Sequence, residues 1–250
     1  MADAPKGPAI RNISDTARWV AFYRAMETER PDAIFQDPYA RKLAGERGEQ
    51  IVNTLRGGKR QSWAMVVRTK VLDDSLLRIL ASEPVDVVMN LAAGLDARPY
   101  RLPLPAALRW IEVDLPEMID YKTEMLAGET PHCQLERVTM DLANVSARRE
   151  LFARINASAR RIFVITEGLL GYLEKEQVAA LAEDLHQADH CRYWITDLAS
   201  PKVKQMMEST GARSSARPAR PSNLLRKKPR DSFARTAGRA LSSMSSTKPR

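Results

Sequence analysis

Apolar and polar residues follow one another along the chain in blocks that predict strands separated by helices. Strand-like apolar runs stand at residues 85–91, 108–115, 133–141, 161–170 and 191–199. Segments with helical periodicity fill the intervals, at residues 116–128, 146–157 and 174–189. This alternation predicts an α/β protein whose parallel sheet is covered by helices on both faces.

The segment before the first strand carries helical patterns only. Residues 14–30 predict a helix that begins at Ser14 or Asp15, and residues 31–45 predict a proline-rich link into a short helix. Residues 61–82 predict a long amphipathic helix. We expect its inward-facing residues to be Val66, Val67, Val71, Leu76, Leu77 and Leu80. These patterns divide the chain into a flexible N-terminus at 1–13, a helical cap at 14–82 and a core at 83–210.

The composition changes sharply at the C-terminal end. Residues 211–250 carry a net charge of +10, whereas the rest of the chain carries −2. Ser, Arg, Pro and Ala dominate this segment, which predicts a disordered basic tail. Two origins stay open: a frameshift near residue 210, or a native tail that binds acidic partners. The nearly neutral body gives no reason to expect nucleic-acid binding.

The cysteines, the histidines and the hydropathy pattern indicate the class of protein further. Cys133 and Cys191 lack the spacing of metal ligands, as do the three histidines, so we expect reduced thiols and no metal. No apolar run approaches the roughly 20 residues of a membrane span, and residues 1–19 lack the apolar core of a signal peptide. We therefore expect a cytoplasmic protein that does not enter a membrane.

Acidic residues follow all of the predicted strands. In a doubly wound sheet, ligands bind beyond the carboxyl ends of the strands. A single acid at such a position is more often a helix cap or a turn residue. Acids after successive strands indicate a binding site more strongly. They are Asp96, Asp114, Asp141, Glu167 and Asp197.

The spacing of Gly94 and Asp114 favours an adenosine ligand. Asp114 lies 20 residues after Gly94, a distance at which an acid on the second strand reaches the hydroxyl groups of a ribose. The segment "LAAGLD" has one glycine, whereas a dinucleotide-binding loop has three. The pattern therefore argues against NAD or FAD and favours an adenosine compound without phosphates, such as S-adenosyl-L-methionine (SAM).

Several motifs, in order over residues 12–208, resemble the SAM-dependent methyltransferases of the leucine carboxyl methyltransferase group, in its actinobacterial branch. The matching segments are "SDTARWVAFYRAMETERPDAIFQDPYARKLAG", "NLAAGLDARPYRL", "LRWIEVDLPEMIDYKTEML", "MDLAN" and "ITEGLLGYL". The resemblance implies a Rossmann-like fold, SAM as the cofactor and methyl transfer to a carboxylate or another small acceptor. It also implies two further strands after the fifth, which this chain does not provide. We therefore expect the C-terminal strands to be missing, and a non-catalytic SAM-binding protein stays open as the alternative.

The resemblance also assigns roles to individual residues. It places Gly94 against the methionine part of SAM, with Asp96 and Arg98 beside it, and Arg18 on the SAM carboxylate. Asp114 would bind the ribose, and Asp141 and Leu142 would lie around the adenine. Glu167 and Gly168 would close the cofactor pocket. It does not indicate which residues are catalytic.

Structural explanations compete with some of these roles. Arg98 could be a surface salt-bridge residue, and Arg18 could lie on an exposed helix face. Asp197 could simply end its strand. Aromatic residues that could line a substrate pocket are more often part of a core. They are Tyr23, Tyr39, Trp63 and Tyr172.

Overall fold

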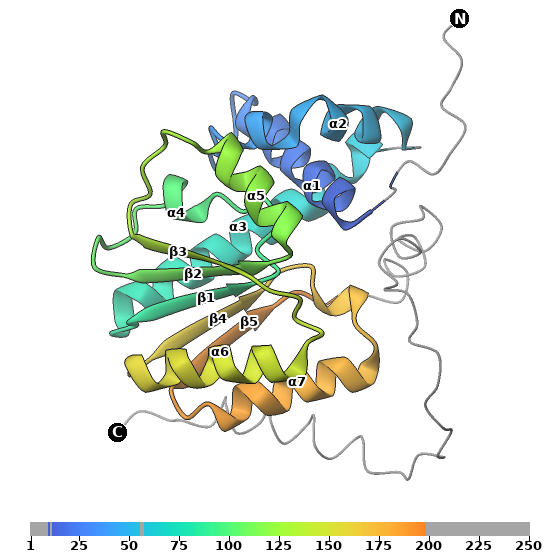
Figure 1. The fold of residues 1–250 in the computed structure, drawn as a ribbon. Coiled ribbons are helices and arrows are strands. Elements are labelled where there is room, and N and C mark those ends of the chain that lie inside the picture. The colour runs from blue at the N-terminus through green and yellow to red at the C-terminus, as the bar shows by residue number, and fades with distance from the viewer. Residues whose placement is uncertain (1–9, 11, 56–57, 199–250) are drawn as a thin grey trace, which may run out of the picture.

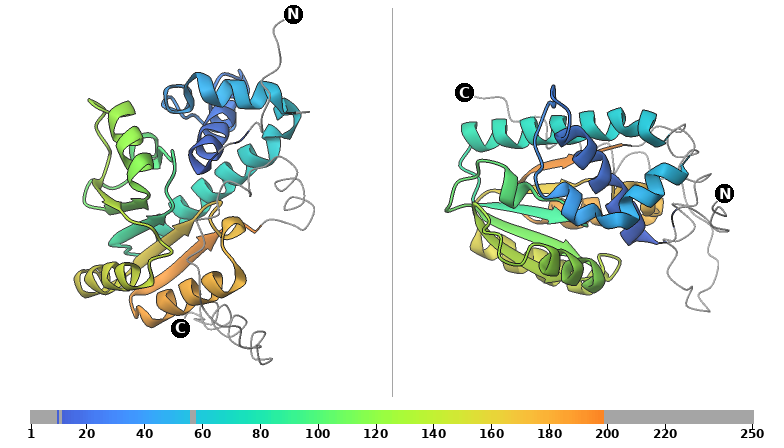
Figure 2. Two further views of the ribbon diagram at one scale, coloured as in Figure 1. Left: turned by 45° about the vertical axis from the view of Figure 1, so that its right-hand side comes forward. Right: turned by 90° about the horizontal axis from the view of Figure 1, so that it is seen from above.

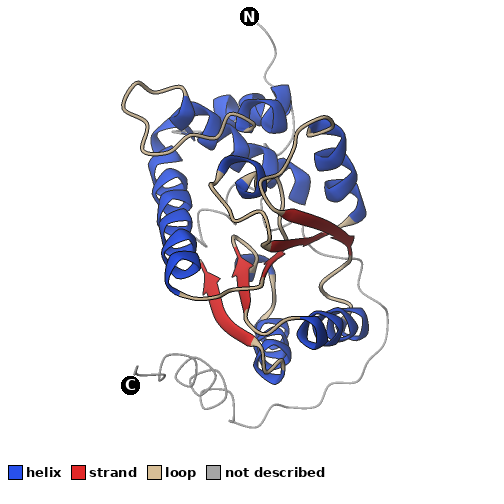
Figure 3. Cartoon of the chain, turned by 90° about the vertical axis from the view of Figure 1, so that its left-hand side faces the viewer, coloured by secondary structure: helices blue, strands red, loops and turns tan. Residues whose placement is uncertain are grey.

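The computed structural model describes residue 10 and residues 12–55 and 58–198. The predicted basic tail at 211–250, the possible frameshift near residue 210 and most of the predicted flexible N-terminus lie outside these residues. The described part of the chain folds as an α/β structure with one sheet between helices (Figures 1 and 3).

The sheet contains five parallel strands in the order β3-β2-β1-β4-β5, which confirms the predicted fold class. The strands are β1 (Val87–Leu91), β2 (Arg109–Asp114), β3 (Gln134–Thr139), β4 (Ile162–Thr166) and β5 (Cys191–Thr196). The chain reverses its direction of winding between β1 and β4, which are neighbours in the sheet. This reversal is the topological switch point, where open α/β sheets bind ligands.

Helices lie on both faces of the sheet. They are α1 (Ile13–Thr28), α2 (Ala40–Thr54), α3 (Gly58–Ser82), α4 (Arg98–Arg101), α5 (Pro116–Met125), α6 (Val145–Ser158) and α7 (Lys175–Gln187), with a short 3₁₀ helix η1 (Leu170–Tyr172). Figure 1 shows α6 and α7 side by side on one face, with α1, α2 and α5 on the opposite side. Figure 2 shows that α3 runs along the sheet toward α1 and α2.

Alternate residues of the central strands form two separate cores. Val87, Met89 and Leu91 of β1 face α6 and α7 in one buried cluster. Val88 of β1 and Trp110 of β2 face the opposite side, in a cluster that includes Leu76 of α3. Because both faces are covered, β1 and β4 are buried along their whole length, as expected for a parallel sheet. Among the described strands, the outer edge of β5 has no neighbour.

Local sequence signals explain where several helices begin. The side chain of Asn12 accepts a hydrogen bond from the Asp15 N–H at 2.8 Å, which caps α1. Pro116 occupies the first turn of α5, where its missing N–H has no helical partner to lose. Glu174 and Gln177 form a capping box at the start of α7. Of these helices, α5 connects β2 to β3 and α7 connects β4 to β5.

The predicted inward face of α3 is partly wrong. Val67 is 45% exposed and Val71 is 55% exposed, whereas Thr69 and Asp73 are buried. The buried face of the helix therefore contains polar residues. The two valines led to a wrong prediction of which face of the helix points inward. The observed rotation places Asp73 inside the protein, where it takes part in the site described below.

The helices before the first strand pack tightly onto the rest of the protein. Trp19 and Phe22 of α1 share a buried cluster with Leu95 and Tyr100, which follow β1. Arg24 of α1 donates to the Leu95 carbonyl oxygen at 2.6 Å. Helix α1 thus covers the carboxyl end of β1. The boundary of a separate cap at residue 82 stays a prediction, because α3 itself contributes to a core on the sheet.

The four aromatic residues considered for a substrate pocket have different positions. Tyr23 is fully buried, and its hydroxyl donates to the Gly58 carbonyl oxygen at 2.6 Å. Tyr39 lies 5.6 Å from Tyr100, measured between ring centroids. Trp63 is 68% exposed on α3. Tyr172 is half-buried on η1, which follows β4.

Candidate functional site

The segment after β1 lies directly against the end of β2. The Gly94 N–H donates to Asp114 Oδ2 at 2.6 Å, and the Leu115 N–H donates to Asp114 Oδ1 at 2.7 Å. Gly94 has a φ of +49°, a conformation that side chains rarely adopt. The spacing in the sequence therefore predicted a real contact: the glycine and the acid 20 residues later touch each other.

The Asp114 carboxyl is buried but keeps acceptor capacity. Burial raises its pKa above the ordinary value, while the N–H groups of Gly94 and Leu115 act in the opposite direction. A carboxylate has about four lone-pair positions, and the two backbone N–H groups use two of them. The remaining positions can accept hydrogen bonds from ligand hydroxyl groups.

Arg98 lies at the centre of a buried network of charges. Its Nε donates to Asp73 Oδ1 at 2.6 Å, and its Nη1 lies 2.7 Å from Asp96 Oδ2 and 2.8 Å from Glu167 Oε2. The Arg98 residue is 2% exposed, so the surface salt bridge considered as an alternative is wrong. Burial alone would lower the Arg98 pKa, but the surrounding carboxylates raise it well above its ordinary value.

Asp96 is held in place by both its own loop and the network. Its Oδ1 accepts from the Arg98 N–H at 2.9 Å, and its Oδ2 accepts from Asn90 Nδ2 at 2.8 Å. Burial would raise the Asp96 pKa, but the charges of Arg98, Lys122 and Arg101 outweigh it and lower the pKa below its usual range. The carboxyl group is therefore ionised at neutral pH.

Arg68 of α3 connects the ends of β4 and β5. Its Nη2 lies 2.9 Å from Glu167 Oε1, and its Nη1 lies 2.9 Å from Asp197 Oδ2. Asp197 Oδ1 accepts from the Gly168 N–H at 2.6 Å. Asp197 thus does more than end its strand: it fixes Arg68 and the backbone of the adjacent loop. Gly168 itself has a φ of +73°.

The sequence analysis missed Arg68 and Asp73 as members of the site. Both lie on α3, which precedes the sheet, and neither follows a strand. No spacing in the sequence singled them out, because α3 also carries the charged residues Lys70, Asp74 and Arg78. In addition, Val67 and Val71 suggested a different inward face.

Arg18 points toward α5 in this structure. Its Nη1 donates to the Tyr121 hydroxyl at 2.8 Å, and its guanidinium carbon lies 3.8 Å from the centre of the Tyr121 ring. The neighbouring residue, Ala17, is the one near Gly94: its Cβ would lie 3.6 Å from a Cβ built on that glycine. The predicted contact of Arg18 with the SAM carboxylate stays a prediction.

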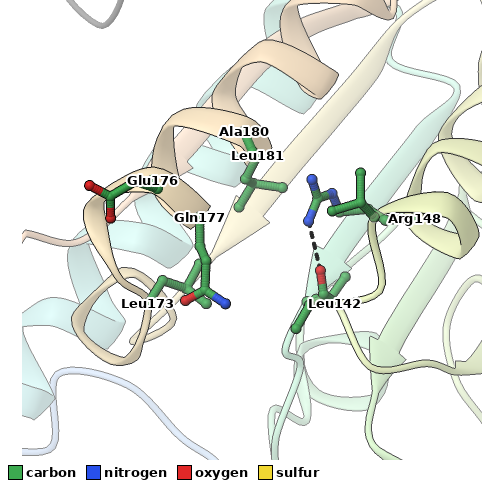
Figure 4. A pocket seen from close by; sticks show the side chains of 9 residues that line it. Leu142, Arg148, Leu173, Glu176, Gln177, Ala180 and Leu181 are labelled. Atoms are coloured by element: carbon green, nitrogen blue, oxygen red, sulfur yellow. Dashed lines mark hydrogen bonds between the residues drawn. The ribbon is translucent and has the colours of Figure 1, made fainter. Parts of the chain in front are cut away.

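Asp141 and Leu142 lie in the turn that leads from β3 into α6. Asp141 is exposed, and its Oδ1 accepts from the Ala143 N–H at 2.8 Å. Leu142 lines a pocket of about 190 Å³ between α6 and α7, opposite Leu173 and Gln177 (Figure 4). The Leu142 carbonyl oxygen accepts from Arg148 Nη1 at 2.7 Å. The pocket shows that the turn after β3 has free space on its apolar side.

The remaining candidates for reactive chemistry are inert in this arrangement. Burial raises the pKa of the Cys133 thiol to about 11 and that of the Cys191 thiol to about 12. Both cysteines are free and protonated at neutral pH. Among the described residues, no group of His, Cys, Asp or Glu side chains has the arrangement of a metal site. Nor does that part of the chain contain a helix long and apolar enough to span a membrane.

The chain belongs to the leucine carboxyl methyltransferase family, whose model matches residues 17–186. The matched region contains the loops after β1 to β4 and most of α1 to α7. Six of the nine residues assigned by resemblance lie on these loops. Asp114 is the last residue of β2, Arg98 is the first residue of α4, and Arg18 lies on α1.

Curated relatives from actinobacteria are similar to the chain over most of its length. A protein of Parafrankia sp. (strain EAN1pec) named "Putative S-adenosyl-L-methionine-dependent methyltransferase" is 36% identical over 183 residues, which cover 69% of this chain and 58% of the relative. A protein with a corresponding name from Frankia alni is 36% identical over 196 residues, covering 73% of this chain and 67% of the relative. The match thus spans about three fifths to two thirds of the length of these relatives.

A solved structure supports the fold independently. A DUF574 family protein from Streptomyces avermitilis matches with a TM-score of 0.56 and 12% sequence identity. The match covers 83% of this chain and 79% of that protein. At this identity, the likeness concerns the arrangement of helices and strands alone.

Proposed function

We propose that the protein is a SAM-dependent methyltransferase that methylates an oxygen of a carboxylate or another small acceptor. The observation that carries this proposal is the contact between Gly94 and the buried Asp114 at the topological switch point. Membership of the methyltransferase family supports the same reading. The nine residues assigned by resemblance remain our candidates for the cofactor site.

The loops after β1 and β2 fit an adenosine cofactor. Apart from its chain neighbours, the nearest atom to a Cβ built on Gly94 is the Ala17 Cβ at 3.6 Å, so a ligand can approach the Gly94 backbone closely. Asp114 keeps unused lone pairs, and it stands 20 residues after Gly94, the sequence spacing expected of an acid that binds a ribose. Beyond β3, Leu142 offers an apolar surface next to free space, which suits the face of an adenine ring.

The charges of the site also suit a cationic cofactor. The network contains the carboxylates of Asp73, Asp96, Glu167 and Asp197 and the guanidinium groups of Arg68, Arg98 and Arg101. The acids therefore exceed the arginines by one charge. A sulfonium group carries one positive charge, so its presence would balance the network.

In this proposal, the residues of the chain position the reactants. SAM supplies the methyl group on its sulfonium when it is bound. Asp114 and Gly94 hold the nucleoside end, and the buried arginine network keeps the loops after β1, β4 and β5 in fixed positions. The overlying helix α1 excludes water from the Gly94 side. If the acceptor is a carboxylate, no general base is needed, because that group is already ionised at pH 7.

The test is calorimetry with SAM and S-adenosylhomocysteine, followed by transfer of a labelled methyl group to a panel of small carboxylic acids. We expect a folded sample to bind both compounds and to label at least one acid. A folded sample that binds neither compound would refute the cofactor assignment. Binding without transfer to any acceptor would favour the alternative, a non-catalytic SAM-binding protein. Among the described strands, the outer edge of β5 has no neighbour, which suits that alternative.

A further inference from the structure

A buried arginine of α1 joins a buried carboxylate to a backbone carbonyl of the loop after β1. Arg24 donates from Nε to Asp37 Oδ2 at 2.8 Å and from Nη2 to the Leu95 carbonyl oxygen at 2.6 Å. Both charged side chains of this pair are buried. Leu95 lies between Gly94 and Asp96. Arg24 therefore reaches from the helices before the sheet to the loop assigned to the methionine part of the cofactor.

The loop after β1 needs support because its backbone includes a strained residue. Ala92 has a φ of +55°, the one positive φ outside glycine among the described residues, and Gly94 follows in the same left-handed region. Such a conformation persists only where the surroundings hold it in place. The peptide unit that begins with the Leu95 carbonyl is also held at its other end, because the Asp96 N–H donates to the Ala93 carbonyl oxygen at 3.0 Å. The arginine contact thus helps to keep the loop in one conformation.

Arg148 of α6 makes the same pair of contacts on the turn after β3. Its Nε donates to Asp184 Oδ2 at 2.8 Å, and both side chains are buried. Its Nη1 donates to the Leu142 carbonyl oxygen at 2.7 Å (Figure 4). The peptide unit that begins with this carbonyl is again held at both ends, because the Ala143 N–H donates to Asp141 Oδ1 at 2.8 Å. The same arrangement therefore occurs twice, on loops that follow different strands.

The chemistry of arginine suits this arrangement. A guanidinium group is planar and carries its N–H donors in a rigid fork, so a contact with a carboxylate fixes the direction of the remaining donors. Asp37 and Asp184 each accept from an Nε atom, and an Nη atom of the same arginine donates to the carbonyl. Because a buried ion pair brings little net stability compared with apolar side chains, its presence at both loops favours a role in positioning.

We propose that Arg24 and Arg148 are positioning residues for the cofactor. Arg24 holds the loop that receives the methionine part of SAM, and Arg148 holds the turn that receives the adenine. This inference rests on the proposed function. Neither arginine contacts the cofactor itself, because each acts through a backbone carbonyl. Loss of one contact should therefore weaken binding only for the part of the cofactor that its own loop receives.

Three ligands separate the two parts of the cofactor. S-adenosylhomocysteine carries both the amino-acid part and the adenine. The compound 5′-methylthioadenosine lacks the amino-acid part, and S-inosylhomocysteine carries hypoxanthine in place of adenine. Calorimetry on folded samples measures the three affinities for each variant, so a change confined to one part of the cofactor can be recognised.

Lysine substitutions keep a cation beside each buried carboxylate but lose the rigid fork. We expect Arg24→Lys to weaken S-adenosylhomocysteine about 10-fold and 5′-methylthioadenosine less than about twofold. We expect Arg148→Lys to weaken both of these ligands about 10-fold and S-inosylhomocysteine less than about twofold. The double variant Arg24→Met with Asp37→Asn removes both charges of the first pair, so no buried carboxylate of that pair is left unpaired. It should reproduce the ligand pattern of Arg24→Lys.

Matched controls separate positioning from the general effect of replacing an ion-paired arginine. Arg47→Lys changes an arginine of α2 that pairs with Asp15 of α1 at 2.6 Å. Arg154→Lys changes an arginine of α6 that pairs with Glu136 of β3 at 2.8 Å. Both partners are side chains outside the two loops. We expect both controls to bind the three ligands as the unaltered protein does.

Other outcomes would overturn the inference. Equal losses for all three ligands would mean that the arginines only support the structure. Unchanged affinities in the lysine variants and in the double variant would mean that the two carbonyls need no arginine to hold their loops. If the unaltered protein bound none of the ligands, the proposed function would fail together with this inference. If the unaltered protein binds the ligands but its variants lack the expected pattern, this inference alone is refuted.

Discussion

The two halves of the candidate site hold the acids at the ends of β2, β4 and β5 by different means. At the ends of β1 and β2, Asp114 is held by backbone N–H groups of Gly94 and Leu115. At the ends of β4 and β5, Glu167 and Asp197 are held by the side chains of Arg68 and Arg98. Among the described residues no cation forms an ion pair with the Asp114 carboxylate, whereas the second half is cross-linked by ion pairs. The comparison indicates that the first half serves the ligand directly, and the second half mainly fixes geometry.

The largest expected effect concerns the ion pairs of the second half. Arg98→Met removes one ion-pair partner from each of the carboxylates of Asp73, Asp96 and Glu167, which costs about 3–5 kcal/mol of unfolding free energy. Denaturant titration measures this loss. The control is Arg154→Met, which breaks an exposed pair with Glu136 and should cost less than about 1 kcal/mol. Similar losses in the two variants would show that the network does not depend on Arg98.

The next prediction compares the acids of the two halves in cofactor binding. Asp114→Ala should weaken SAM binding by about 2–3 kcal/mol, because ribose hydroxyls would lose their buried acceptor. Asp197→Ala should weaken SAM binding much less, because its carboxylate acts through Arg68 and Gly168. Calorimetry on folded samples of both variants gives the two affinities. Equal losses would mean that the ribose does not bind at Asp114.

The two halves also differ in how well their contacts could be predicted from the sequence. The strands, the order of elements and the contact between Gly94 and Asp114 follow from local patterns, because hydrophobic alternation and chain spacing specify them. The role of α3 did not follow from such patterns. Its inward face contains Thr69 and Asp73, so apolar periodicity gave the wrong rotation and hid the partners of Arg98. Ion pairs between distant segments leave no periodic signal in a single sequence.

Acid should affect the two halves in opposite directions. The pKa of Glu167 is lowered: burial would raise it, but Arg98 and Arg68 outweigh burial. Its contribution to stability is therefore present above the unfolded pKa, roughly 4, and is lost as the pH falls toward the folded pKa. The pKa of Asp114 is raised, first by burial, so its ionised form opposes folding and protonation removes that penalty.

Unfolding free energies measured between about pH 7 and pH 3 test this difference. We expect the decrease in stability at acid pH to become shallower in Glu167→Gln and steeper in Asp114→Asn. Each substitution removes one titrating group and keeps a side chain of similar size. The same change of slope in both variants would contradict the assigned directions.

The smallest effect concerns the backbone of the first half. Gly94 and Gly128 both have positive φ angles, +49° and +86°, so alanine at either position should cost about 1 kcal/mol of stability. A Cβ at Gly128 would meet no atom within 4 Å, and a Cβ at Gly94 would meet only Ala17 at 3.6 Å, an ordinary contact. The two alanine variants should therefore unfold with similar losses. SAM affinity should fall about 10-fold in Gly94→Ala alone, because only there would the new methyl group occupy the surface that the ligand approaches. Unchanged affinity in Gly94→Ala would show that the cofactor does not lie against this loop, even if Asp114 proves essential.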